Sequence, residues 1–454
     1  MQFVASIFKD YDVRGLYPDE LNANTFNLIA QELALFYHPK TVAIGRDIRD
    51  SSQELQKAMI EGFISQGVDV VDLGLITTDM IYFAAGKIGY DLNIVITGSH
   101  VQKGNGFKIC QKGALPISGE GGLYQIRDLL LKRTSFPVSE KKGQLTQKNI
   151  LDEWINHALS FVDLKTIKPF KIVIDTGNGT GGLVIPPIEK ALPGEFINLF
   201  LELDGSFPNH FPNPLIAENL KFAIDKVKET KADMGIVFDA DGDRAFFIDE
   251  KGNSLSGTIL TAIVSKNILQ KSPNETILYN AVCGRVVPEI VKEMGGNPIR
   301  VRVGYSIIRK KMREHNAVFA GEHSGHFFFR DNYFADSGLI MMLEVLELVS
   351  QEKRPFSAIA RDFQKYPQSE EINFKVDDKL KMMDKVEAAY KEKAQSTDRL
   401  DGISVWFSDW WFNVRPSGTE SLLRLNVEAD NESLLQEKTT ELTNFLLAAG
   451  AIKA

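Results

Sequence analysis

Short apolar runs alternate with segments of helical periodicity along most of this chain. Such runs predict strands with both faces buried. Between the first two runs, Ser51 with Glu54 three residues later predicts a capping box at the start of a helix. The repeated order of strand and helix predicts parallel α/β sheets, which gather ligands at the carboxyl ends of their strands. The clearest runs are TVAIG (41–45), VDVVDLG (68–74), NIVITGS (93–99), KIVIDTGNGTGG (171–182) and TILYNAV (276–282).

Polar segments divide this pattern into four parts. They lie near 139–148, after the hairpin-like IDEKGNS at 248–254, and near 366–371. The chain of 454 residues is also too long for one ordinary core. In the last part, a strand-like VWFSDWWFNVR precedes a polar turn, the run LLRLNVEA and a closing helix. We therefore expect three α/β domains and a smaller α+β domain, with bounds of 1–145, 146–250, 251–367 and 368–454.

Composition narrows the classes of protein that fit. Hydrophobic residues make up 44% and charged residues 25%, as in a water-soluble globular protein. The formal net charge of -8 argues against a nucleic-acid binder, although a local cluster of Arg and Lys can still hold an anionic substrate. Cys110 and Cys283 lie far apart, which gives little support for a disulfide or a zinc site. No secretory signal or stretch of ~18–20 apolar residues is visible. We expect a cytoplasmic protein, monomer or homodimer, with no membrane partner.

The sharpest local motif is DADGDR, at 239–244. The run GIVF before it predicts a strand that delivers Asp239, Asp241 and Asp243 at alternate positions past its end. Three close carboxylates repel one another unless a cation lies between them, and oxygen ligands favour magnesium or calcium. An EF-hand loop is the first alternative, since Glu250 falls at its twelfth place, but Arg244 replaces the glycine that its sixth place needs. A solvated acidic turn is the second. A metal site is the better interpretation.

A second motif is TGSHVQKGNGFKI, at 97–109. It follows a predicted strand, and Gly98 would allow a tight turn before Ser99. His100 and Lys108 stand nearby. A serine hydroxyl becomes a useful nucleophile when a metal or a base activates it and cations neutralise an incoming phosphoryl group. Taken alone, this segment is more typical of an ordinary turn.

Two further motifs contain groups that bind phosphate or sugar. In RPSGTE (415–420), Arg415 can hold a phosphate with two parallel hydrogen bonds, and Ser417, Gly418 and Thr419 add donors. In GEHSGH (321–326), Glu322 and Ser324 could bind paired sugar hydroxyls. A metal site at His323 and His326, three residues apart, is a weaker alternative, and a core position remains open for either histidine.

Together, in this order and spacing, the four motifs resemble the α-D-phosphohexomutase family. The segments FKDYDVRG (8–15) and GRDIRDSS (45–52) are similar to the start of that family as well. Within it, GEHSGHFFFRDNYFADSG and FNVRPSGTESLLRLNVEA are most similar to bacterial phosphomannomutases and to the phosphomannomutase/phosphoglucomutase enzymes. The resemblance implies four domains around a central cleft, each contributing one motif. It also implies interconversion of mannose 6-phosphate and mannose 1-phosphate through a hexose 1,6-bisphosphate.

The resemblance implies a role for each matching residue. Ser99 would be the phosphoserine, and its phosphate would complete a Mg²⁺ site with Asp239, Asp241 and Asp243. The groups implied around the transferring phosphoryl group are Arg14, His100, Lys108 and Arg244, with Tyr11 close by. Glu322 and Ser324 would hold sugar hydroxyls, with His326 nearby. The clamp implied for the phosphate that does not react consists of Arg415, Ser417, Gly418 and Thr419.

This sequence departs from the family pattern at several places. Val101-Gln102 stand where Asn-Pro is usual, and the loop to Lys108 is about one residue shorter. Tyr305 replaces a histidine, and Val282 replaces a lysine common in related enzymes. His100, Lys108 and Tyr305 therefore remain the candidates for the acid or base at the sugar hydroxyl.

Several other functions stay open at this point. One is a phosphoglucomutase or an enzyme of dual specificity, and phosphoglucosamine mutase fits less well. A second is a phosphatase that uses Asp239 as an aspartyl nucleophile. A third is a sugar-phosphate binder without catalytic activity, which the changes at Val101, Val282 and Tyr305 permit.

Overall fold

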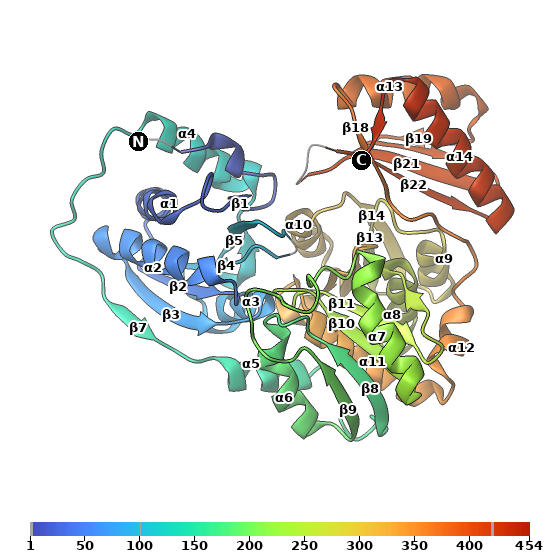
Figure 1. Ribbon diagram of the computed structural model, residues 1–454, viewed down its shortest axis with the longest axis horizontal. Helices are drawn as coiled ribbons and strands as arrows, with labels where there is room; N and C mark the ends of the chain where they lie inside the picture. Colours follow the sequence, from blue (N-terminus) through green and yellow to red (C-terminus); the bar gives the residue numbers. More distant parts are fainter. Residues whose placement is uncertain (1–2, 100, 419–421) are drawn as a thin grey trace.

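The computed structural model describes residues 3–99, 101–418 and 422–454. It contains four sheets, and each is formed by one continuous part of the chain. Figure 1 shows the four units following one another around the molecule, from the blue first unit to the red fourth. Within the described ranges, no helix is both long and apolar enough to cross a membrane.

The first sheet is mixed. β2 pairs in parallel with both β3 and β4, whereas β5 runs antiparallel to β4 and β1. All five residues of β4 are buried, which explains its continuous apolar sequence. The strands are β1 (Val13–Leu16), β2 (Thr41–Arg46), β3 (Asp69–Leu75), β4 (Leu92–Ile96), β5 (Gly104–Gln111), β6 (Leu115–Pro116) and β7 (Leu145–Gln147). The helices are α1 (Ala23–Tyr37), α2 (Asp50–Ser65), α3 (Thr78–Phe83) and α4 (Tyr124–Lys132).

The second and third units also combine parallel and antiparallel pairs. In the second, β10 is parallel to β8 and antiparallel to β11, so the loop that joins β10 to β11 lies at one end of the sheet. In the third, β15 is parallel to β13 and antiparallel to β16. The second unit contains α5 (Leu151–Leu159), β8 (Phe170–Asp175), α6 (Gly181–Ala191), β9 (Gly194–Leu199), α7 (Ala217–Thr230), β10 (Met234–Phe238), β11 (Ala245–Asp249) and β12 (Ser254–Leu255). The third contains α8 (Gly257–Lys271), β13 (Thr276–Asn280), α9 (Val286–Glu293), β14 (Asn297–Val301), α10 (Tyr305–His315), β15 (Phe319–Gly321), β16 (Phe327–Phe329), β17 (Ala335–Asp336), α11 (Gly338–Glu352) and α12 (Phe356–Arg361).

The fourth unit is an antiparallel sheet with helices. Its sheet order is β19-β20-β21-β22-β18-β23. Its elements are β18 (Ile372–Lys375), α13 (Lys379–Tyr390), β19 (Ser396–Asp398), β20 (Ile403–Trp406), β21 (Trp410–Pro416), β22 (Leu423–Ala429), α14 (Glu432–Ala448) and β23 (Ile452–Lys453). The predicted fold class, three α/β units and a smaller α+β unit, is confirmed.

The apolar core is not divided evenly among the units. One continuous cluster of buried side chains includes Val95 of β4, Phe238 of β10 and Phe319 of β15, and so joins the first three units. The fourth unit has a separate core, which includes Phe412 and Leu442. Polar contacts such as the 2.7 Å ion pair between Arg300 and Asp398 connect it to the third unit. Burial of apolar surface therefore holds three units together more firmly than it holds the fourth.

Two local predictions are wrong. The capping box does not form, because α2 begins at Asp50 and its N-cap residue, Arg49, makes no side-chain cap. Ser51 instead accepts a hydrogen bond from Asn105, and Glu54 accepts one from the hydroxyl of Tyr17. The run VWFSDWWFNVR is two strands rather than one, since β20 and β21 form an antiparallel hairpin.

Candidate active site

Ser99 lies in the loop that follows β4, and its backbone conformation is unusual. Its φ of 44° is in the left-handed region, which is uncommon for a residue other than glycine. Gly98 begins a turn, since its carbonyl oxygen accepts a hydrogen bond from the Val101 amide at 3.0 Å, and its lack of a side chain is needed for close packing as well. A Cβ at Gly98 would lie 2.6 Å from both Nε of Arg49 and the carbonyl oxygen of Gly104. The loop is thus packed too closely against its neighbours for any larger residue before the serine.

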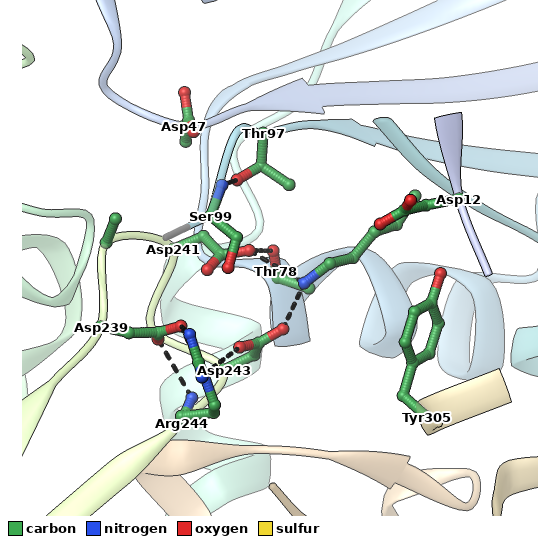
Figure 2. A network of polar contacts seen from close by, with 12 residues as sticks. Asp12, Asp47, Thr78, Thr97, Ser99, Asp239, Asp241, Asp243, Arg244 and Tyr305 are labelled. Atoms are coloured by element: carbon green, nitrogen blue, oxygen red, sulfur yellow. Dashed lines mark hydrogen bonds and ion pairs between the residues drawn. The ribbon is translucent and has the colours of Figure 1, made fainter. Parts of the chain in front are cut away.

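Two residues of GRDIRDSS hold the serine loop. The Asp47 carboxylate accepts hydrogen bonds from the backbone N–H groups of Gly98 and Arg49, both at 3.1 Å. The Arg49 guanidinium donates to the carbonyl oxygen of Ser99 at 2.5 Å. Thr97 accepts from the Ser99 amide at 2.8 Å (Figure 2). Sequence analysis gave Asp47 and Arg49 no role, although the segment that contains them was part of the family resemblance.

The three aspartates of DADGDR come together as predicted from their spacing. Asp239, Asp241 and Asp243 are at most 1% exposed, and each offers a carboxylate oxygen within 4.8 Å of the others. Oδ1 of Asp241 and Oδ1 of Asp243 are buried and have no hydrogen-bond partner among the described residues. A buried carboxylate oxygen without a partner is costly unless a cation binds it. The residues present therefore fit a divalent metal with oxygen ligands.

Positively charged side chains surround the aspartates. Lys108 reaches Oδ2 of Asp241 at 3.0 Å and also contacts Asp243. Arg244 donates from Nε to Asp239 at 2.8 Å, and the hydroxyl of Thr78 donates to Asp241 at 2.7 Å. Figure 2 shows Ser99 beside Asp241, above the pair formed by Asp239 and Arg244. The serine and the acidic loop, 140 residues apart in the chain, thus share one site.

Burial and pairing move the pKa values of these groups in opposite directions. Burial raises the pKa of Asp239, and Arg244 offsets only part of the rise. Burial acts against the charge of Asp241 as well, but Lys108 and Thr78 hold the pKa of that carboxyl below its usual value. For Lys108, burial is outweighed by Asp241 and Asp243, which raise its pKa well above the usual range. Lys108 is therefore a protonated ammonium group at neutral pH.

Tyr11 and Tyr305 connect the first and third units. The hydroxyl of Tyr11 donates to the carbonyl oxygen of Val303 at 2.9 Å, and the hydroxyl of Tyr305 donates to the carbonyl oxygen of Tyr11 at 2.6 Å. A Cβ at Gly304 would lie 2.5 Å from the Tyr11 ring, and one at Gly418 would lie 2.7 Å from it. Tyr11 thus occupies a space between two glycines, one in the third unit and one in the fourth.

Arg14 lies near Tyr305 and the acidic loop. It is 8% exposed, pairs with Asp12 at 2.8 Å, and is close enough to Asp241 for that carboxylate to help raise its pKa against the effect of burial. A buried guanidinium beside the acidic loop can contact a phosphoryl group there.

The loop GEHSGH begins at the last residue of β15, at the carboxyl end of that strand. Oε1 of Glu322 accepts hydrogen bonds from the Gly304 amide at 3.1 Å and from Asn280 at 3.2 Å, while Ser324 is half-buried in the turn. Nδ1 of His326 lies 2.8 Å from Asp336 and 3.9 Å from Asp243. The loop thus lies beside the acidic loop. Sequence analysis did not select Asp336, which is 90 or more positions from both Asp243 and the serine.

The alternative of a metal held by both histidines is not supported. His323 hydrogen-bonds through Nδ1 to the hydroxyl of Thr258 at 2.8 Å. In the ranges that the structure describes, the possible ligand groups include His326, with Asp243 and Asp336, but not His323.

The loop RPSGTE connects β21 to β22. Arg415 is 5% exposed and Ser417 is 8% exposed, and Gly418 lies against Tyr11. Thr419, like His100 of the serine loop, lies outside the described residues. Two residues that we did not predict accompany Arg415: Arg424 is directly opposite it on β22, and Glu371 contacts both arginines. Sequence alone offered only the charge of Arg424 as a signal.

Comparison with known proteins identifies the family. Models of the phosphoglucomutase/phosphomannomutase alpha/beta/alpha domains I, II and III match residues 5–134, 152–252 and 256–366, and the model of its C-terminal domain matches 371–444. A Xanthomonas campestris protein described as "Phosphohexose mutases" is 39% identical over 442 residues, which cover 97% of this chain and 98% of that protein. The chain belongs to the phosphoglucomutase/phosphomannomutase family. The family suggested by the motifs is therefore confirmed, and with it an isomerase of the phosphohexomutase type.

Other family members match the whole chain or nearly all of it. The phosphomannomutase of Escherichia coli (strain K12) is 38% identical over 448 residues, or 97% of this chain and 98% of its own. The crystal structure of a phosphoglucomutase/phosphomannomutase family protein from Burkholderia thailandensis has a TM-score of 0.91, with 31% identity and full coverage of both chains. The four-unit architecture described above is thus that of the family.

The contacts of Tyr305 explain one departure from the family pattern. Tyr305 was a candidate for the acid or base at the sugar hydroxyl. Its hydroxyl hydrogen is directed to the carbonyl oxygen of Tyr11, and burial raises its pKa well above the usual value. Tyr305 is therefore poorly suited to accept a proton, and its contacts are those of a residue that joins two units.

Proposed function

We propose that this protein is a phosphomannomutase that interconverts mannose 6-phosphate and mannose 1-phosphate through a phosphorylated Ser99. The observation that carries the proposal is the position of Ser99 beside the buried aspartates of the acidic loop, two of which Lys108 contacts. The relatives named phosphomannomutase, at 36–38% identity over nearly the whole chain, support mannose phosphate as the substrate. Phosphoglucomutase activity, alone or in addition, is the main alternative.

The chain's own residues suit transfer of a phosphoryl group to and from Ser99. Lys108 and Arg14 carry positive charge on the side of the site where the phosphoryl oxygens would lie, and Arg244 neutralises Asp239. Positioning and charge neutralisation account for most of the catalysis of such transfers. The phosphoryl group would pass from Oγ of Ser99 to the free hydroxyl of the hexose phosphate. The other phosphate of the resulting 1,6-bisphosphate would then return to Ser99.

The cofactor that we propose is Mg²⁺. Asp239, Asp241, Asp243 and the phosphate on Ser99 would hold it, since these are the hard oxygen ligands that it prefers. When bound, it supplies positive charge that stabilises the serine oxygen as leaving group and as nucleophile. Glu322 and Ser324, with His326 nearby, would orient the sugar, and the RPSGTE loop would hold the phosphate that is not reacting.

The structure argues against the phosphatase alternative. An aspartyl nucleophile needs an oxygen that can approach a phosphorus atom. Asp239 is 0% exposed, and Arg244 contacts both of its oxygens, from the backbone N–H at 3.2 Å to Oδ1 and from the side chain at 2.8 Å to Oδ2. Ser99 is therefore the better nucleophile of the two.

A coupled assay with three substrates tests the function. With Mg²⁺ and a trace of hexose 1,6-bisphosphate, we expect turnover of mannose 1-phosphate with a kcat/KM at least equal to that of glucose 1-phosphate, and little turnover of glucosamine 1-phosphate. A clear preference for glucose would make the protein a phosphoglucomutase. Binding of all three without turnover would leave a sugar-phosphate binder.

Arg415 provides a test of the phosphate loop. Replacing it with alanine removes a charge-assisted contact to the phosphate, so Arg415→Ala should lower kcat/KM roughly tenfold to a hundredfold. Steady-state kinetics with each hexose phosphate would measure the loss, with Arg361→Ala as a surface control. Unaltered kcat and KM would place the phosphate elsewhere.

A further inference from the structure

Two arginines of the fourth unit lie side by side on adjacent strands of its sheet. Arg415 on β21 and Arg424 on β22 are partners in the antiparallel register. Directly opposed residues project from the same face, and like charges in such a pair repel. Glu371 lies against both: Nη2 of Arg415 is 3.0 Å from Oε2, and Nη1 of Arg424 is 3.1 Å from Oε1. Each carboxylate oxygen thus contacts one guanidinium group.

The sheet fixes Glu371 in this place. Glu371 immediately precedes β18, and β18 pairs with β22 so that Ile372 is opposite Leu425, the residue after Arg424. Its side chain is 29% exposed, whereas that of Arg415 is 6% exposed. A buried guanidinium without a counter-charge is costly, so Glu371 stabilises Arg415 whenever the phosphate loop is empty.

The same carboxylate has the opposite effect on a bound ligand. A hexose phosphate in the loop carries negative charge and would lie against the guanidinium group that Glu371 contacts. The Glu371 carboxylate and the phosphate of the ligand would repel each other. Because Glu371 is partly exposed, this repulsion is weaker than between two buried charges, but it is still significant for two groups that contact the same guanidinium. Glu371 therefore offsets part of the attraction that the arginines exert on a phosphate.

A lower affinity of the phosphate loop for its ligand would favour the reaction proposed above. The bisphosphate must release one phosphate from this loop, turn, and place the other phosphate there before the second transfer. Contacts that bind every state equally tightly lower KM without speeding the chemistry, and they slow the release on which the turn depends. We propose that Glu371 moderates the affinity of the phosphate loop so that the bisphosphate can leave it and turn. This inference rests on the proposed function.

A neutral isostere tests the inference. Glu371→Gln keeps an oxygen and a similar shape but removes the charge. In a Ser99→Ala background, which prevents turnover, we expect calorimetry to show mannose 1-phosphate binding roughly threefold to tenfold more tightly than in the parent. In the enzyme with Ser99 intact, KM and kcat should both fall, and inorganic phosphate should become a stronger competitive inhibitor. Unchanged or weaker binding would overturn the inference.

Glu371→Ala separates charge from geometry, since it removes both contacts to the arginines. Tighter binding in the Ala and the Gln variants supports an effect of charge. Weaker binding in the Ala variant, with no change in the Gln variant, would mean that Glu371 only positions the arginines, and would contradict the inference. Thermal unfolding would establish that each variant is folded before its affinity is compared.

Glu275 offers a matched control. It pairs with Arg330 at 3.1 Å, and both side chains are 25% exposed. It precedes β13, which runs parallel to β15, so it lies at the end of the third sheet opposite the GEHSGH loop. Glu275→Gln should leave affinity unchanged. Arg415→Ala in the same background distinguishes the two proposals. If it does not weaken binding, the assignment of the phosphate site fails. If it does weaken binding while Glu371→Gln does not tighten it, only the inference about Glu371 fails.

Discussion

Ser99→Ala should eliminate mutase activity, with a loss in kcat of at least about a thousandfold. The variant lacks the oxygen that, in the mechanism we propose, carries the phosphoryl group, and no remaining contact in the site would substitute for that covalent intermediate. The residue is 3% exposed, and alanine is slightly smaller, so the fold should persist. Mass spectrometry after incubation with hexose 1,6-bisphosphate would show one phosphate on the parent enzyme and none on the variant.

Labelling should map to the peptide that contains position 99. Ser254→Ala, at an exposed position in β12, should retain both label and activity. A parent enzyme that turns over substrate yet never becomes labelled at Ser99, or a Ser99→Ala variant with substantial activity, would contradict the mechanism.

Asp241→Asn should have the second largest effect, a loss of roughly a hundredfold or more in kcat together with weaker binding of Mg²⁺. The substitution removes one of three negative charges and an oxygen that is buried without a partner among the described residues. Thr78 can still donate to the remaining amide oxygen, so the loop should keep its shape. Calorimetric titration with Mg²⁺ and activity as a function of Mg²⁺ concentration would measure both effects.

The matched control is Asp233→Asn, at the opposite end of β10. Asp233 is exposed and accepts a hydrogen bond from the Lys171 backbone amide, so its charge is remote from the site. It should bind Mg²⁺ as the parent does. Full activity of Asp241→Asn at low Mg²⁺ concentration would remove this loop from the metal site.

The strands and the acidic loop were predictable because their signals are local. GIVF is a continuous apolar run, and β10 consists of that run and one preceding residue, Met234. All five residues of β10 are buried. DADGDR comes directly after it, so chain geometry alone brings the three carboxylates together. The polar segment IDEKGNS likewise indicated the hairpin of β11 and β12, which pair in antiparallel orientation.

The capping box failed because tertiary contacts override local preference. Its pattern requires Ser51 as the N-cap residue, but Asp47 and Arg49 bind the serine loop, and the N-cap is Arg49, two residues earlier. The left-handed φ of Ser99 has the same origin. Such a conformation persists only where surrounding contacts impose it, and sequence periodicity contains no record of them.

The missed residues of the site share another property, which is distance along the chain. Glu371 contacts Arg415 across 44 positions, and Thr78 contacts Asp241 across 163. Nothing in the spacing of either pair predicts contact, because the first depends on the pairing of strands within the fourth unit and the second on how the first two units pack. Local sequence identified the four motifs and the family resemblance implied their roles, but neither indicated the residues that position them.

The separate core of the fourth unit has a consequence for how the enzyme handles its ligand. The three units that share a core carry Ser99, the acidic loop and the GEHSGH loop. Arg415 and its loop belong to the fourth unit, whose contacts with the other three are largely ionic and polar, such as that of Arg285 with Glu428. Rotation of the fourth unit would disturb few apolar contacts, so a substrate could enter and leave without any rearrangement of Ser99 and the acidic loop.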